Sequence, residues 1–221
     1  MNIFDIIGPV MVGPSSSHTA GAVKIGYIAR QLMNNKIKKA ELYLHGSFSA
    51  TGKGHGTDKA LVAGLLGMKP DDNRIPVSFE IAEELGLEIR FGSINLRDVH
   101  PNSVFMRLYN DNDKKMEIVA SSIGGGQIRI CKIDGLDVNF SGDQPTLIVH
   151  NTDKPGHVSK VTSMLAEHSV NISGMQLYRT QRGGNAVMVI ECDQEVPKSS
   201  LDFLKNMDGI VNVTYLSKEE K

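Results

Sequence analysis

The last third of the chain alternates between strand-like and helix-like patterns in an order that few folds can accommodate. Apolar residues fall at helical spacing at Val158, Val161 and Leu165, and Pro197 precedes a second helical segment over 198–207. The segments that read as strands are 146–150 (TLIVH), 171–180, 186–191 and 211–215. The order strand–helix–strand–strand–helix–strand predicts a ferredoxin-like βαββαβ unit.

The first strand of this unit runs into the turn Asp153-Lys154-Pro155-Gly156. A βαββαβ unit with Asp-Lys-Pro-Gly at this place resembles an ACT domain. The resemblance implies that the loop binds an amino acid at an interface between two copies, through Asn151, Asp153, Pro155 and Gly156. A glycine that permits close approach and free N–H groups at a helix start suit a carboxylate. A Pro-Gly turn that only joins strand to helix is the alternative.

A polar stretch at 141–145 (SGDQP) separates this unit from the rest of the chain and predicts domains at 1–144 and 145–221. In the first domain we expect one helix from about Thr19, another from Thr57 to Gly67, and a third over 76–85. Strands are expected over 39–47, 105–109, 117–121 and 127–132. These patterns predict a mixed α/β domain with a largely antiparallel sheet, and an α+β fold class for the whole chain.

The balance of charge excludes some partners. With 24 Lys and Arg against 25 Asp and Glu, the formal charge is −1, so neither nucleic acid nor an anionic membrane is expected as a partner. No apolar stretch approaches the ~20 residues of a membrane span, and a cytoplasmic protein is expected. Cys131 and Cys192, far apart in sequence, are too few for a cluster or structural zinc site, so we expect no metal bound by this chain alone.

A first candidate site is the hydroxyl-rich segment 13–19 (GPSSSHT), directly before the first predicted helix. Hydroxyl groups at a helix start can cap it, and the free N–H groups favour an anion. A helix cap alone would need only one serine. The histidine in the cluster favours carboxylate binding or proton transfer by a set of five residues: Ser15, Ser16, Ser17, His18 and Thr19.

A second candidate site is the glycine-rich segment 46–58, predicted as a loop between a strand and a helix. It matches neither the P-loop nor the dinucleotide-binding spacing of glycines. Backbone freed by glycines can approach a ligand closely, although a solvated loop is the alternative. The candidate residues here are Ser47, Thr51, Gly52, Lys53, Gly54, His55, Gly56 and Thr57, with weaker candidates at His100 and Asn102 and in the glycine run 124–126.

Together with the ACT-like unit, the segments 1–22, 46–58, 100–102 and 124–126 resemble the beta chain of iron–sulfur L-serine dehydratases over nearly the whole chain. The first domain is also similar to the allosteric substrate-binding domain of some phosphoglycerate dehydrogenases. The second similarity leaves open whether the two candidate segments form an active site or a regulatory one.

The resemblance implies a lyase of amino-acid catabolism and gluconeogenesis that converts L-serine to pyruvate and ammonia. It implies a 4Fe-4S cluster on a partner alpha chain, a hetero-oligomer with self-association of the ACT or beta domains, and no activity of this chain alone. His55 would be the base, with His18 as the second catalytic candidate, and the other candidates of the two segments, with His100 and Asn102, would bind substrate. The alternative is a non-catalytic regulatory module that binds serine or another small amino or hydroxy acid.

Overall fold

The computed structural model describes residues 10–34, 37–112 and 114–217. The chain divides into two compact units, residues 1–135 and 136–221. The predicted boundary after residue 144 lies beyond this division, past strand β6 (Leu136–Phe140) and within the polar stretch 141–145.

The five strands of the first unit lie in a sheet in the order β2-β1-β3-β4-β5. Strands β1 and β2 are parallel, whereas β1–β3, β3–β4 and β4–β5 are antiparallel, so the prediction of a largely antiparallel sheet is confirmed. Sequence patterns did not indicate β2 and β6. The strands of the first unit are β1 (Lys39–His45), β2 (Glu88–Ser93), β3 (Asn102–Tyr109), β4 (Lys115–Gly124) and β5 (Gln127–Ile133).

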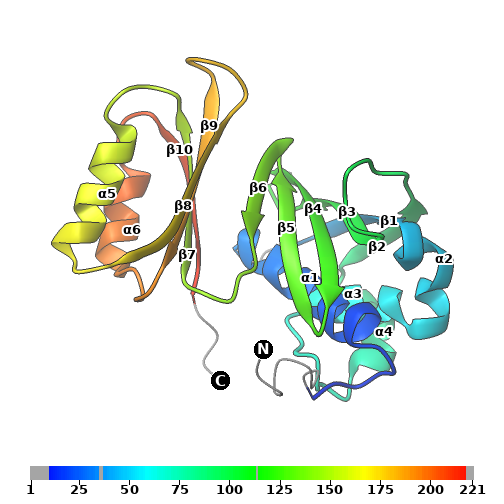
Figure 1. The fold of residues 1–221 in the computed structure, drawn as a ribbon. Coiled ribbons are helices and arrows are strands. Elements are labelled where there is room, and N and C mark those ends of the chain that lie inside the picture. Colours follow the sequence, from blue (N-terminus) through cyan, green and yellow to red (C-terminus); the bar gives the residue numbers. More distant parts are fainter. Residues whose placement is uncertain (1–9, 35–36, 113, 218–221) are drawn as a thin grey trace. The chain divides into compact units, whose positions relative to one another are not determined.

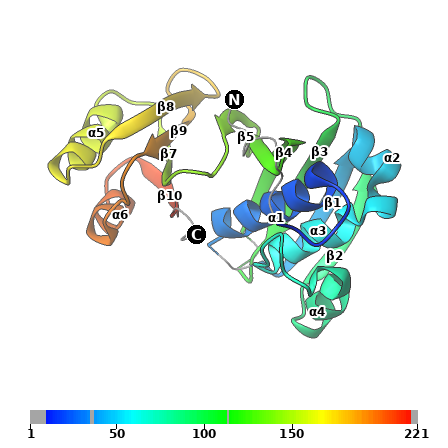
Figure 2. The ribbon, with the colours of Figure 1, turned by 60° about the horizontal axis from the view of Figure 1, so that its bottom comes forward.

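Helices α1 and α3 pack together against one face of this sheet (Figures 1 and 2). The unit also has a short π-helical turn before α1 and a 3₁₀ turn before α4. The bounds of these elements are η2 (Ser16–Ala20), α1 (Gly21–Leu32), α2 (Gly46–His55), α3 (Thr57–Leu65), η3 (Ile75–Val77) and α4 (Ser78–Glu84).

A pair of glycines brings α1 and α3 into backbone contact. A Cβ atom added to Gly26 would lie 2.3 Å from the Leu61 carbonyl oxygen, and one added to Gly64 would lie 2.0 Å from the Val23 carbonyl oxygen. Only glycine fits such a crossing. Because η2 runs directly into α1, and α2 is followed directly by α3, this contact fixes the distance between the two candidate segments.

The prediction of a glycine-rich loop at 46–58 is wrong, because residues 46–55 form the helix α2. Three glycines within one helix weaken its intrinsic stability. Burial of Phe48, which is fully inaccessible, and of Gly52 against Thr57 supplies the tertiary packing that offsets this weakness. Gly56, in the left-handed conformation, ends α2, and α3 begins at Thr57 as predicted.

The second unit carries a four-stranded antiparallel sheet in the order β10-β7-β9-β8, with helices α5 and α6 on one face (Figure 1). Its apolar core lies between the sheet and the two helices and includes Leu147, Val161, Met188 and Leu204. The predicted βαββαβ order is confirmed by β7 (Thr146–Thr152), α5 (His157–Glu167), β8 (Ile172–Arg179), β9 (Asn185–Cys192), α6 (Lys198–Lys205) and β10 (Ile210–Leu216). The two units together confirm the α+β fold class.

Candidate active site

The hydroxyl-rich segment forms the π-helical turn η2, in which the Gly21 N–H donates to the Ser16 carbonyl oxygen. Such wide turns occur frequently at functional sites. Ser15 is the cap residue, and its Oγ accepts a hydrogen bond from the His18 N–H at 3.1 Å. The turn therefore places His18 and three hydroxyl groups at the start of α1.

Helix α2 places two more hydroxyl groups beside His18. Ser47 and Thr51 lie one helical turn apart, and each hydroxyl oxygen lies 3.2 Å from Nε2 of His18. On the other side of the ring, Nδ1 lies 3.3 Å from Ser17 Oγ and 3.5 Å from Ser15 Oγ. Both nitrogens of His18 are thus surrounded by hydroxyl groups from the two candidate segments.

His55, at the end of α2, has one nitrogen bonded and one open. Its Nδ1 lies 3.1 Å from the Thr51 carbonyl oxygen. A carbonyl can only accept, so Nδ1 carries the hydrogen of the neutral ring and Nε2 keeps its lone pair. The side chain is exposed, so this lone pair is accessible to a ligand.

The two imidazole rings converge, with centroids 5.0 Å apart and planes inclined by 38°. Burial lowers the pKa of His18 below its ordinary value of 6.5, and the neighbouring His55 lowers it further, while a hydrogen bond with the Ser47 backbone acts in the opposite direction. His18 is consequently neutral at pH 7.

The lowered pKa of His18 predicts a loss of stability in mild acid. Because the folded pKa lies below the unfolded value near 6.5, the unfolded chain takes up the proton first. Stability is complete above that value and decreases as the pH falls through the folded pKa. We expect His18→Gln to reduce the drop in melting temperature between pH 7.5 and 5.5. An equal drop in the variant and the natural chain would contradict this linkage.

The segment with His100 and Asn102 lies beside the start of α2. The Ser47 N–H donates to the Pro101 carbonyl oxygen at 2.9 Å, and Asn102 forms a β-bridge with Gly46. Asn102 also donates its N–H to Nδ1 of His100 at 3.1 Å. The structure therefore brings this weaker candidate segment next to the glycine-rich one.

Other predicted site residues lie away from the hydroxyl groups around His18. Thr19 and Thr57 are buried, and their hydroxyl groups have no partner among the described residues. Gly52 packs against Thr57, whereas Gly54 has open space beside it. Ser16 and Gly56 are half-buried, and the Lys53 side chain lies outside the described residues, as do 1–9 of the first motif. Substrate binding by these residues stays a prediction.

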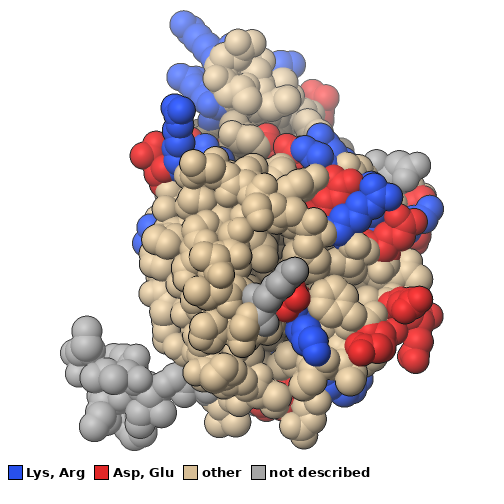
Figure 3. Space-filling model, turned by 90° about the vertical axis from the view of Figure 1, so that its right-hand side faces the viewer, with Lys and Arg blue, Asp and Glu red and all other residues tan. Residues whose placement is uncertain are grey.

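The face of the first unit that carries α2 has few charges. Figure 3 views this face, and a broad area of it shows no described Lys, Arg, Asp or Glu, while acidic side chains gather along one border. The centre of a protein–protein interface is usually poor in charged residues. The uncharged surface around this polar site is therefore suited to contact with another protein.

The described residues hold no group of three or more His, Cys, Asp or Glu arranged to bind a metal ion. Cys131 lies in β5 of the first unit and Cys192 in β9 of the second, and both are free thiols. These two cysteines do not fit an iron–sulfur cluster. In the same described residues, no helix is both long and apolar enough to cross a membrane.

In the second unit, the predicted ligand loop is tied to the β8–β9 hairpin. Asp153 accepts hydrogen bonds from the Gly183 N–H at 3.0 Å and from Arg179 at 2.8 Å, which lower the pKa of its carboxyl group. Gly156 has a positive φ of 95° and precedes α5. Asn151 Oδ1 and His157 Nδ1, on residues only 3% and 7% exposed, have no partner in the described part of the chain.

Comparisons with known proteins agree with these features. Residues 2–86 match the family model "Serine dehydratase beta chain", and 145–206 match the ACT domain. The "Probable L-serine dehydratase, beta chain" of Bacillus subtilis (strain 168) is 40% identical, over 98% of each chain. The "L-serine dehydratase, beta chain" of Peptoniphilus asaccharolyticus is 38% identical, over 96% of each chain.

A more distant relative is "D-3-phosphoglycerate dehydrogenase" of Methanocaldococcus jannaschii, 24% identical over 89% of this chain but only 37% of the relative. The two dehydratase beta chains, by contrast, match this chain from end to end at 38–40% identity. The chain belongs to the family of L-serine dehydratase beta chains.

Proposed function

We propose that this chain supplies the acid–base and carboxylate-binding half of an active site that converts L-serine to pyruvate and ammonia. The observation that carries the proposal is the geometry of His55, whose Nδ1 bond to the Thr51 carbonyl leaves Nε2 as an open base. Its position 5.0 Å from the His18 ring places this base next to the hydroxyl groups of both candidate segments.

The remaining groups suit the substrate's carboxylate. The N–H groups at the start of η2 and the hydroxyl groups of Ser15, Ser17 and Ser47 can donate hydrogen bonds to it. The uncharged His18 can accept or donate through either nitrogen. His55 would then remove the α-proton while the hydroxyl group leaves as hydroxide, and this proton and the hydroxide together give the water that is released. The aminoacrylate that forms tautomerises to an imine, which water hydrolyses to pyruvate and ammonia.

The leaving hydroxyl group needs a Lewis acid, and the described residues hold no group of three or more His, Cys, Asp or Glu side chains that could bind a metal ion for that role. The proposal therefore assigns the 4Fe-4S cluster to the alpha chain, whose iron would act there as a Lewis acid. The same assignment makes this chain inactive alone and places the alpha chain over the uncharged face around α2 (Figure 3). The resulting hetero-oligomer would be a cytoplasmic enzyme.

The test is anaerobic co-purification with the alpha chain, followed by iron and sulfide analysis and an assay of pyruvate. We expect cluster and activity in the complex and neither in the isolated chain. A complex with a full cluster but no turnover of L-serine would contradict the proposal. If replacements in η2 and α2 altered only activation by serine, with turnover intact, the site would be regulatory.

We further propose that the second unit binds a small amino acid at the start of α5. His157 begins α5, and Asn151 lies near the end of β7, the strand that runs into the loop before this helix; the unpartnered polar atoms of these two buried residues suit hydrogen bonds to a ligand. Thr152 lies alongside and donates its N–H to the Gly209 carbonyl, and the His157 ring packs close to Gly209. A bound carboxylate and ammonium would satisfy groups that otherwise stay unpaired.

Asn151→Ala tests this second proposal. We expect calorimetry to show at least about tenfold weaker binding of L-serine, or of another amino acid found in a screen, because one buried acceptor is lost. Ser163→Ala, a change at an exposed position of helix α5, is the control, and this variant should bind the amino acid as tightly as the natural chain does. Equal affinity in the Asn151 variant would refute binding at this loop.

A further inference from the structure

Among the residues that the structure describes, strand β2 leaves one side of the first unit's sheet unpaired. Within that part of the chain it is the terminal strand of the sheet and pairs with β1 alone, in parallel. The Glu88 N–H donates to the Lys38 carbonyl and the Ile94 N–H to the Leu44 carbonyl, both at 2.9 Å. Since alternate residues of a parallel strand bond to one neighbour, the backbone groups of Ile89, Phe91 and Ser93 point outward. An extended chain can pair with such an edge.

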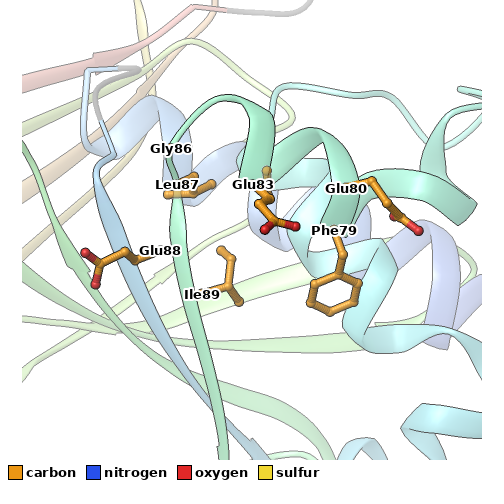
Figure 4. Close-up of a pocket in the computed structure, with 8 residues that line it drawn as sticks. Phe79, Glu80, Glu83, Gly86, Leu87, Glu88 and Ile89 are labelled. Atoms are coloured by element: carbon orange, nitrogen blue, oxygen red, sulfur yellow. The ribbon is translucent and has the colours of Figure 1, made fainter.

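A cavity of about 560 Å³ lies between α4 and this edge, which we call the edge pocket (Figure 4). Phe79 and Ile89 give it an apolar lining, and Glu80, Glu83 and Glu88 add carboxylates. Phe91, 39% exposed, packs against Phe79 with ring centroids 5.9 Å apart, and Leu85 nearby is 70% exposed. Exposed apolar residues of this size beside an open strand mark a contact surface.

The charge of the edge pocket indicates the chemistry of its occupant. Glu80, Glu83 and Glu88 are exposed, and within the described residues none of them takes part in an ion pair. Two copies of this chain that paired edge to edge would bring the two sets of carboxylates together, which is unfavourable. A strand that carries Lys or Arg beside apolar residues complements both the charge and the lining.

We propose that β2 and the edge pocket bind an extended, basic segment of the alpha chain, which adds a strand to the sheet. The edge leads to the candidate active site, because Ser93 at the end of β2 lies 2.9 Å, Oγ to Oγ, from Ser49 of α2. A segment along β2 therefore reaches the surface over which the alpha chain must lie. This inference rests on the proposed function for the identity of the partner. The candidate site itself lies on the other side of α2, not in the edge pocket.

The test measures the affinity of the full-length chain for the alpha chain at low and moderate salt. Glu80→Lys combined with Glu83→Lys should weaken binding at least tenfold, most strongly at low salt. Glu84→Lys changes the same charge on the same helix but does not line the edge pocket, and it should bind within twofold of the natural chain. Natural affinity in the double variant would overturn the inference.

Phe91→Pro gives an independent measurement, because it removes an outward N–H without removing a bond to β1. We expect binding to weaken about tenfold while the variant stays folded, with a melting temperature lowered by the lost contact between Phe91 and Phe79; if this variant does not fold, the double charge variant decides. Self-association of the isolated chain that Phe91→Pro abolishes, or no binding of the alpha chain at all, would overturn the inference. The proposed function is tested separately, by the turnover of L-serine by the complex of the natural chains. If the variants bound the alpha chain more weakly but the natural complex were inactive, only the proposed function would be refuted.

Discussion

Replacing His55 by glutamine is expected to lower the turnover of L-serine by the assembled dehydratase by about 10²–10⁴-fold, the usual contribution of a general base. Glutamine keeps the size and polarity of the side chain but has no nitrogen that can take a proton at neutral pH. Because His55 is exposed at the end of α2, its loss should leave folding intact. The measurement is pyruvate formation by the anaerobic complex, with iron and sulfide determined in the same sample.

His168→Gln is a closely matched control. His168 directly follows α5, whereas His55 is the last residue of α2, and in both residues Nδ1 lies near the carbonyl oxygen four residues earlier, at 2.9 Å from Met164 and 3.1 Å from Thr51. It belongs to the second unit, so its replacement should leave turnover within about twofold of the natural value. Near-normal turnover of the His55 variant with an intact cluster would remove His55 from the reaction.

Gly64→Val is expected to destabilise the first unit by about 3 kcal/mol, at the upper end of the usual cost of overpacking. Even its Cβ would overlap the Val23 carbonyl oxygen, and backbone cannot move aside as a flexible side chain can. For a unit of this size, such a loss lowers the melting temperature by on the order of 10 °C. Circular dichroism or calorimetry of the isolated chain measures this directly.

Gly54→Ala is the appropriate comparison, because no atom lies within 4 Å of the added Cβ. Alanine in this helix should leave stability unchanged or raise it by up to about 1 kcal/mol. If Gly64→Val melted at the natural temperature, the close crossing of α1 and α3 would not exist. At temperatures where it remains folded, we also expect the variant to lose turnover, since the crossing holds His18 near His55.

The second unit was predictable because its strands and helices have strong and distinct periods. The apolar residues Val211, Val213 and Tyr215 alternate, which indicates a strand. The spacing of the apolar residues from Val158 to Leu165 indicates a helix. Strand β6 has the same alternation, buried at Leu136, Val138 and Phe140, but it is short. Strand β2 is exposed at most positions, so its sequence has no pattern of apolar residues from which a strand could be predicted.

Helix α2 and the meeting of the two histidines could not be predicted from local sequence. Three glycines indicate a loop, and only the burial of Phe48, which depends on distant parts of the chain, favours a helix. Residue type alone identified His18 and His55 as candidates. Their convergence depends on Gly26 and Gly64, which have no reactive side chain. These glycines act only by allowing α1 and α3 to pack closely together.

The short distance between the imidazole rings of His18 and His55 limits the positive charge that the candidate active site can carry. Once one ring is protonated, its charge opposes protonation of the other. One surplus proton at a time can therefore be kept, and in the proposed elimination the hydroxide that leaves the substrate takes it up as water. A partner that seals the site then has to leave an exit for that water molecule in every catalytic cycle, and none for a proton.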